Sequence, residues 1–150
     1  MTYKDLKHLV NVLLTGDVTL TKKDEEVIVL LRYAFERVAN EADALKLFTT
    51  EDPNERIVRN GPGNLFIRMP KVPEYEEDEI DVDEELCFAV ARFICSFIST
   101  EKVDLHLREA SRIINSYNQK VQTFFETLEA NNRFPESSNR DDAIFGSRIY

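Results

Sequence analysis

Hydrophobic residues recur at intervals of three and four along most of this chain, which is the spacing of one face of an α-helix. The first such pattern covers residues 3–14, and Gly16 follows where a helix would end. A second pattern begins at Thr21, with Asp24 three residues further on as in an imperfect capping box, and continues to about Ala44. The spacing therefore predicts two amphipathic helices in the first third of the chain.

Between residues 45 and 73 the spacing changes to an alternation of apolar and polar positions. Two short β-prone runs, 56–59 and 64–69, flank the turn sequence Asn-Gly-Pro-Gly, and Pro70 follows. We therefore expect a β-hairpin. Because a two-stranded hairpin is only marginally stable by itself, we expect it to pack on helices or to add to strands of another chain.

The second half of the chain returns to helical spacing. Asp83 is placed to cap a helix over residues 86–98, whose apolar surface is interrupted only by Arg92 and Ser96, so we expect this helix to form the centre of the core. A long helix is expected from Val103 to about residue 130. Its apolar positions alternate by three and four and are Leu107, Ala110, Ile114, Tyr117, Val121, Phe124 and Leu128.

These elements predict a mainly α-helical protein, namely an antiparallel bundle of about four helices with a small β-hairpin insertion and an extended C-terminal tail. A chain of 150 residues, 43% of them hydrophobic, has the size and balance of one domain with a single core. We expect this helical domain over residues 1–130, with the hairpin at about 55–70 and an acidic loop at 74–85. Residues 131–150 are polar with isolated apolar side chains, and we interpret them as an extended docking tail.

Acidity is concentrated in that loop. The formal net charge of the chain is −9, and residues 74–85 contain nine carboxylates and no basic residue, so the remainder has no net charge. A protein that binds nucleic acid by neutralising its phosphates needs a broad basic surface. Free DNA or RNA is therefore not expected as a ligand.

Three interpretations of the acidic stretch remain open. It can be a solvated loop that aids solubility. It can pair with basic residues of the hairpin in another copy, which gives head-to-tail contacts that close into a ring. It can also repel nucleic acid or mimic it. The second interpretation predicts a subunit interface formed by Arg56, Arg59, Arg68, Lys71, Glu76, Glu77, Asp78 and Glu79.

No arrangement of residues is typical of catalysis, and we expect neither an enzyme nor a metal or cofactor site. His8 and His106 are the only histidines and have no neighbouring nucleophile to activate. Cys87 and Cys95 stand eight residues apart on one predicted helix, too far for a disulfide, and are expected to be buried thiols. No apolar run is long enough to cross a bilayer and no signal-peptide pattern is present, so we expect a soluble protein that is not secreted.

The order of these elements resembles that of the head-completion adaptors of tailed bacteriophages. The resemblance rests on a short first helix, a second helix with an acidic start (residues 21–26), a hairpin at 56–69, an apolar helix at 86–98 and a long last helix followed by a tail. Those adaptors are small helical proteins that form a ring, commonly of twelve copies, beneath the portal.

The resemblance implies a structural role in the neck of a virion, after synthesis in the host cytoplasm. Such a ring joins the portal to the tail or to the next ring protein, with DNA only as passing cargo and no membrane contact. It implies attachment to the portal through the last helix and the tail. Here those segments contribute Phe124, Phe125, Leu128, Ile144, Phe145, Arg148, Ile149 and Tyr150.

A function of a different class remains open. The acidic stretch can also belong to a small regulatory protein, for example a DNA mimic that occupies the basic cleft of a target through residues 74–85. An adaptor is expected to lose assembly without residues 143–150, whereas a mimic is expected to lose target binding when the carboxylates of residues 76–79 are neutralised.

Overall fold

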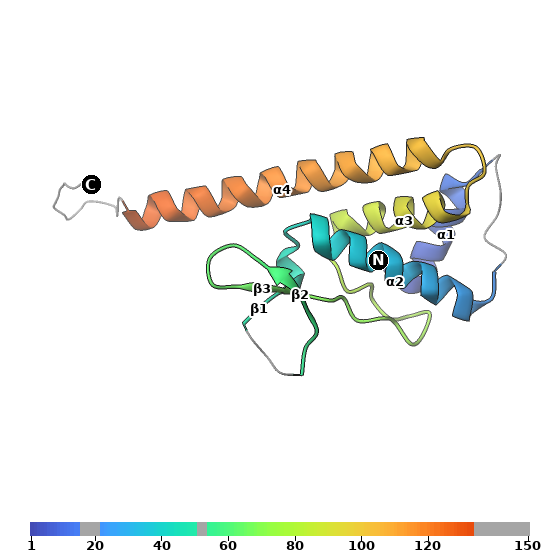
Figure 1. Cartoon of the computed structure of the whole chain (residues 1–150), viewed down its shortest axis with the longest axis horizontal. Coiled ribbons are helices and arrows are strands. Elements are labelled where there is room, and N and C mark those ends of the chain that lie inside the picture. Colours follow the sequence, from blue (N-terminus) through green and yellow to red (C-terminus); the bar gives the residue numbers. More distant parts are fainter. Residues whose placement is uncertain (16–21, 51–53, 134–150) are drawn as a thin grey trace. The chain divides into compact units, whose positions relative to one another are not determined.

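A computed structural model describes residues 1–15, 22–50 and 54–133. The chain divides into two units, Met1–Asn118 and Gln119–Tyr150. The elements in chain order are α1 (Tyr3–Leu13), α2 (Asp24–Glu41), the 3-10 turn η1 (Leu45–Leu47), β1 (Phe48–Thr49), β2 (Ile57–Asn60), β3 (Phe66–Arg68), α3 (Glu84–Ile98) and α4 (Val103–Arg133) (Figure 1). The predicted fold class, mainly helical with a small antiparallel β element, is confirmed. The tail was predicted over residues 131–150, but α4 continues to Arg133, and residues 134–150 lie outside the described residues.

Helix α3 forms the centre of the core, as its composition predicted. Both α1 and α2 pack against it. Two aromatic side chains of this central helix are nevertheless not covered, because Phe88 and Phe97 are 44% and 42% exposed. The buried positions of this helix are Leu86, Cys87, Ala89, Val90, Ala91, Phe93, Ile94, Cys95 and Ser96.

The first two helices begin differently from each other. The hydroxyl of Thr2 accepts a hydrogen bond from the Asp5 N–H at 3.1 Å, and the Asp5 carboxylate accepts from the Thr2 N–H at 3.3 Å, which is a complete capping box. Helix α2 instead begins after Lys23, whose side chain makes no capping hydrogen bond. Its first turn is acidic and lies at the positive end of the helix dipole, which is favourable. The predicted capping residue, Thr21, lies outside the described residues.

The small sheet has the strand order β1-β3-β2, with both pairs antiparallel. Strands β2 and β3 are the predicted hairpin, and a bulge between Ile57 and Arg59 interrupts their register. Gly63 adopts a φ of 61° in the connecting turn, a conformation that glycine accepts without steric cost. The central strand buries Ile67, and β2 packs against α2, so this hairpin is supported by helices of its own chain.

The acidic stretch is anchored to the beginning of the chain. The N–H groups of Tyr3 and Lys4 donate to the carbonyls of Asp78 and Glu76 at 2.9 and 3.0 Å. The Ile80 N–H donates to the Met1 carbonyl at 2.9 Å. Since the side chain of Ile80 is also buried, the stretch follows a fixed path over the surface of the first unit.

Candidate interaction surfaces

Many carboxylates of the acidic stretch meet cationic groups of the same chain. The Lys7 ammonium lies 2.7 Å from Glu76 and 3.2 Å from Asp24. The Met1 ammonium lies 2.7 Å from Glu84 and 3.3 Å from Glu79. These ion pairs are partly exposed, so each contributes little to stability, but together they reduce the net field of the stretch.

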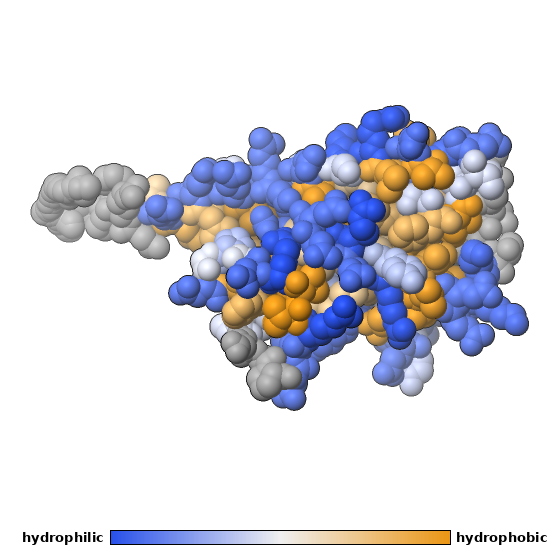
Figure 2. All heavy atoms as spheres, in the orientation of Figure 1, coloured by the Kyte–Doolittle hydropathy of each residue, from blue (hydrophilic) through white to orange (hydrophobic). Residues whose placement is uncertain are grey.

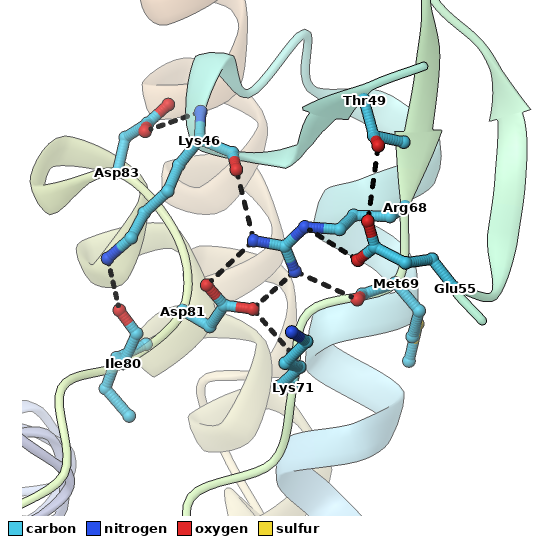
Figure 3. A network of polar contacts seen from close by, with 9 residues as sticks. All are labelled: Lys46, Thr49, Glu55, Arg68, Met69, Lys71, Ile80, Asp81 and Asp83. Atoms are coloured by element: carbon cyan, nitrogen blue, oxygen red, sulfur yellow. Dashed lines mark hydrogen bonds and ion pairs between the residues drawn. The ribbon is translucent and has the colours of Figure 1, made fainter. Parts of the chain in front are cut away.

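The most buried ion pair of the acidic stretch joins Arg68 of β3 to Asp81. The guanidinium forms two parallel hydrogen bonds with the carboxylate, at 2.5 and 3.0 Å, in the bidentate geometry that makes such pairs strong. Figure 3 shows Arg68 at the centre of a network that also includes the carbonyl of Lys46, at 3.2 Å, and the carboxylate of Glu55, at 3.5 Å. The Lys71 N–H adds a third hydrogen bond to Asp81 at 2.8 Å.

This network determines the ionisation of both partners. Burial by itself raises the pKa of Asp81, but the hydrogen bonds from Arg68 and from the Lys71 N–H outweigh it and hold the pKa below the ordinary value for Asp. The hydrogen bonds to Asp81 raise the pKa of Arg68 despite its burial. Both groups are therefore charged at neutral pH, and the contact fastens the acidic stretch to the sheet.

Arg59 of β2 caps the end of α2. Its Nε donates to the Ala39 carbonyl at 2.9 Å, and its Nη2 donates to the Ala42 carbonyl at 2.7 Å and to the Asp43 carboxylate at 3.1 Å. The last carbonyls of a helix have no hydrogen-bond partner within the helix, and a cation here donates to them. The same cation also lies at the negative end of the helix dipole, which stabilises it. Helix α2 ends at Glu41, three residues before the predicted end.

The predicted subunit interface therefore contains two kinds of residues. Arg59, Arg68, Glu76 and Glu79 already have charged partners in their own chain. Asp78 accepts from the N–H groups of Glu74 and Tyr75 and so closes a turn. Contact between these groups in different copies stays a prediction. Lys71 and Glu77 are exposed, and Arg56 is exposed and approaches Glu36 only to 3.9 Å. Glu76 and Glu79 are exposed as well as paired.

Asp83 has a role that the sequence pattern did not indicate. It occupies the N-cap position of α3, as predicted, but its side chain makes no capping hydrogen bond there. The carboxylate instead accepts from the Lys46 N–H at 3.0 Å and from the Tyr117 hydroxyl. That hydroxyl accepts from the Leu45 N–H at 3.1 Å. A tyrosine within an apolar stripe was the available signal, since a buried hydroxyl needs a partner.

The cysteine thiols are buried within the first unit, as predicted. Burial raises the pKa of Cys87 to about 11 and that of Cys95 to about 12, so both remain protonated at neutral pH. His106 is also buried, and its Nδ1 lies 3.1 Å from Nη1 of Arg92. Because a guanidinium only donates hydrogen bonds, this ring nitrogen is the acceptor. His8 is exposed.

The predicted docking residues of the last helix belong to the second unit. The predicted apolar seam of α4 is buried at Ala110, Ile114 and Tyr117, within the first unit. The same seam continues to Phe124 and Leu128, which are 51% and 42% exposed. The ring of Phe125 makes an edge-on contact with Phe124, with 5.6 Å between the centroids. The other predicted docking residues, Ile144, Phe145, Arg148, Ile149 and Tyr150, lie outside the described residues.

Two further apolar surfaces lie on the first unit. The first is a groove of about 370 Å³, here called the Phe88 groove, lined by Leu13, Glu85, Phe88, Arg92, Glu109, Arg112, Ile113 and Ser116. The second, here called the Tyr33 patch, surrounds a hollow of about 300 Å³ lined by Tyr33, Glu36, Arg37, Asn40 and Phe97. Figure 2 shows hydrophobic side chains over α3, between α2 and α4, bordered by hydrophilic ones.

Within residues 1–15, 22–50 and 54–133, no group of three or more His, Cys, Asp and Glu side chains is placed to hold a metal ion. In the same ranges, no helix combines the length and the apolar character needed to span a membrane. Comparison of the chain with protein-family models, with curated proteins and with solved structures finds no match.

Proposed function

We propose that this chain is a structural protein of a bacteriophage virion, a head-to-tail adaptor that forms a homomeric ring and joins the portal to the tail around the DNA channel. The order of helices and strands agrees with the element order on which the resemblance to such adaptors rests. The partners in this proposal are further copies of the chain, the portal protein and a tail or next ring protein.

The observation that carries the proposal is the apolar seam of α4. Its first part is buried in the first unit, while Phe124 and Leu128, four residues apart on one face, remain half exposed. Exposing two large apolar side chains on one helical face is costly in water, and amphipathic helices of this kind dock into grooves of partner proteins through such positions. The proposal assigns this face, together with residues 143–150, to the portal.

The ion pairs of the acidic stretch favour the role of an adaptor over that of a DNA mimic. A DNA mimic needs free carboxylates spaced along a track, whereas Glu76, Asp81 and Glu84 are paired within the chain. The remaining negative charge, including that of Glu77, suits a surface near passing DNA, because like charge prevents adhesion. The proposal therefore gives the stretch a repulsive or subunit-facing position in the ring.

Docking through α4 is tested with purified portal rings of a tailed bacteriophage. The double variant Phe124→Asp, Leu128→Asp is compared with the wild type and with Thr123→Asp, a matched change of an exposed residue beside the seam. We expect the wild type and Thr123→Asp to sediment with the portal rings and the double variant to remain in the supernatant. A wild-type chain that ignores portal rings would contradict the proposal.

A further inference from the structure

The two apolar surfaces of the first unit lie on opposite sides of α3. Phe88 belongs to the groove and Phe97 to the Tyr33 patch, and they stand nine residues apart on the same helix. Nine residues are two and a half turns of an α-helix, so the two side chains point in opposite directions. The two surfaces therefore cannot cover each other within one chain, but they are placed to meet between copies.

The Phe88 groove is lined by both apolar and charged side chains. Its apolar residues come from three helices, namely Leu13 of α1, Phe88 of α3 and Ile113 of α4. The charges that line it compensate one another, since Arg112 donates to Glu109 at 2.9 and 3.1 Å. An incoming apolar side chain can therefore be buried there without leaving a set of like charges unpaired.

The Tyr33 patch exposes two aromatic rings. The ring of Tyr33, 57% exposed, makes an edge-on contact with Phe97, with 6.3 Å between the centroids. Val29, one turn earlier on α2, is exposed beside it in the i, i+4 spacing of a docking face. Arg37 in this patch is compensated within the chain, because its Nε lies 2.6 Å from Glu41 and its guanidinium stacks over the ring of Phe93.

We infer that the Tyr33 patch of one copy docks into the Phe88 groove of the next, and that this contact builds the ring of the proposed function, on which the inference rests. Two different surfaces in contact form a heterologous interface, which propagates from copy to copy and closes when the rotation allows. Tyrosine and phenylalanine are the residue types that dominate such interfaces, because each buries a large area when it is covered.

The charges at the two surfaces identify a second copy as the occupant. The side chain of Arg112 at the groove is 67% exposed and lies 2.9 Å from Glu109, and that of Glu36 at the patch is 50% exposed and lies 3.9 Å from Arg56. Such exposed ion pairs contribute little to stability, so both charges can exchange their partners for each other across an interface. They have opposite signs and each stands beside the aromatic residue that docking would bury. This complementarity predicts an ion pair between Glu36 of one copy and Arg112 of the next, in addition to the contact of Tyr33 with Phe88.

The inference is tested by sedimentation equilibrium of the full chain and three variants. Tyr33→Asp disrupts the patch and Phe88→Asp disrupts the groove. Tyr75→Asp is the control, because it changes another exposed tyrosine, 65% exposed against 57% for Tyr33, that lines neither surface. We expect Tyr33→Asp and Phe88→Asp each to weaken self-association at least tenfold, while Tyr75→Asp associates like the wild type. Circular dichroism of each variant verifies that the helices are retained.

Mixing the two defective variants gives the sharpest result. Tyr33→Asp keeps an intact groove and Phe88→Asp keeps an intact patch, so an equimolar mixture is expected to form a one-to-one dimer and to grow no further. The charge reversals Glu36→Arg and Arg112→Glu are each expected to weaken association, and their combination in one chain is expected to restore it.

Several results would overturn the inference. These are a wild-type chain that stays monomeric at millimolar concentration, single variants that associate like the control, or a mixture that forms no dimer. None of these variants alters the seam of α4. The wild type can therefore bind portal rings even where the proposed contact between copies is wrong. Attachment to the portal and contact between copies are thus tested separately.

Discussion

Arg68 and Arg56 have the same charge and lie beside the same small sheet, yet their environments differ. The side chain of Arg68 is 14% exposed and is held by Asp81, whereas that of Arg56 is 70% exposed and approaches Glu36 only to 3.9 Å. A buried, bidentate pair determines local structure, while an exposed pair at this distance contributes little. At the scale of single residues, the structural effect of a charged side chain in this protein therefore depends on its partner and on its burial.

Replacing Arg68 by methionine is expected to destabilise the fold by about 3–5 kcal/mol, because Asp81 is left buried without its cation. The matched change Arg56→Met is expected to alter the free energy of unfolding by less than about 0.5 kcal/mol. Urea denaturation followed by circular dichroism measures both. Equal effects of the two substitutions would refute the structural role of Arg68.

The buried thiols predict a loss of stability in alkali. A group whose pKa is raised by folding stabilises the protein below its unfolded pKa, and this contribution declines as the pH rises toward the folded pKa. For Cys87 and Cys95 the decline begins near pH 9 and continues toward their folded pKa values of about 11 and about 12. In urea titrations between pH 8 and pH 10.5, the double variant Cys87→Ala, Cys95→Ala is expected to lose less stability than the wild type. Parallel pH profiles of the two chains would be inconsistent with this explanation.

At the scale of elements, hydrophobic spacing predicted the four helices and the hairpin, because each of those signals is local. Strand β1 has only two residues and therefore no period to detect. The side-chain contacts of Asp83 with Lys46 and Tyr117 join residues far apart in sequence, and spacing carries no information about such pairs. For the same reason the sequence identified the charged residues of the candidate interface without showing which of them are paired within the chain.

Arg59 connects two elements, and its loss is expected to affect the end of α2. The variant Arg59→Met keeps the aliphatic stem but removes the donors to Ala39, Ala42 and Asp43. We expect it to destabilise the protein by about 1–3 kcal/mol. Amide hydrogen exchange is expected to accelerate first in the last turn of α2, where the capped carbonyls lie. Exchange that rises uniformly over α1, α2 and α3 would argue against a local cap.

At the scale of the whole molecule, different surfaces are proposed to bind different neighbours. The Tyr33 patch and the Phe88 groove are proposed to join copies, and the exposed face of α4 at Phe124 and Leu128 is proposed to join the portal. The acidic stretch is fastened to its own chain through Lys7 and Arg68, so its charge is carried on a fixed surface. With this division, the proposed contact between copies and the proposed attachment to the portal can be disrupted independently.

The most direct test of the account is the mass of the chain measured by light scattering, alone and with portal rings, for the full chain and for a chain ending at Asn132. We expect each portal ring to gain a fixed number of copies of the 17.4 kDa full chain, twelve in the ring that the resemblance implies. The shortened chain is expected to bind portal rings much more weakly. A full chain that adds no mass to portal rings, at concentrations where both are folded, would contradict the central claim.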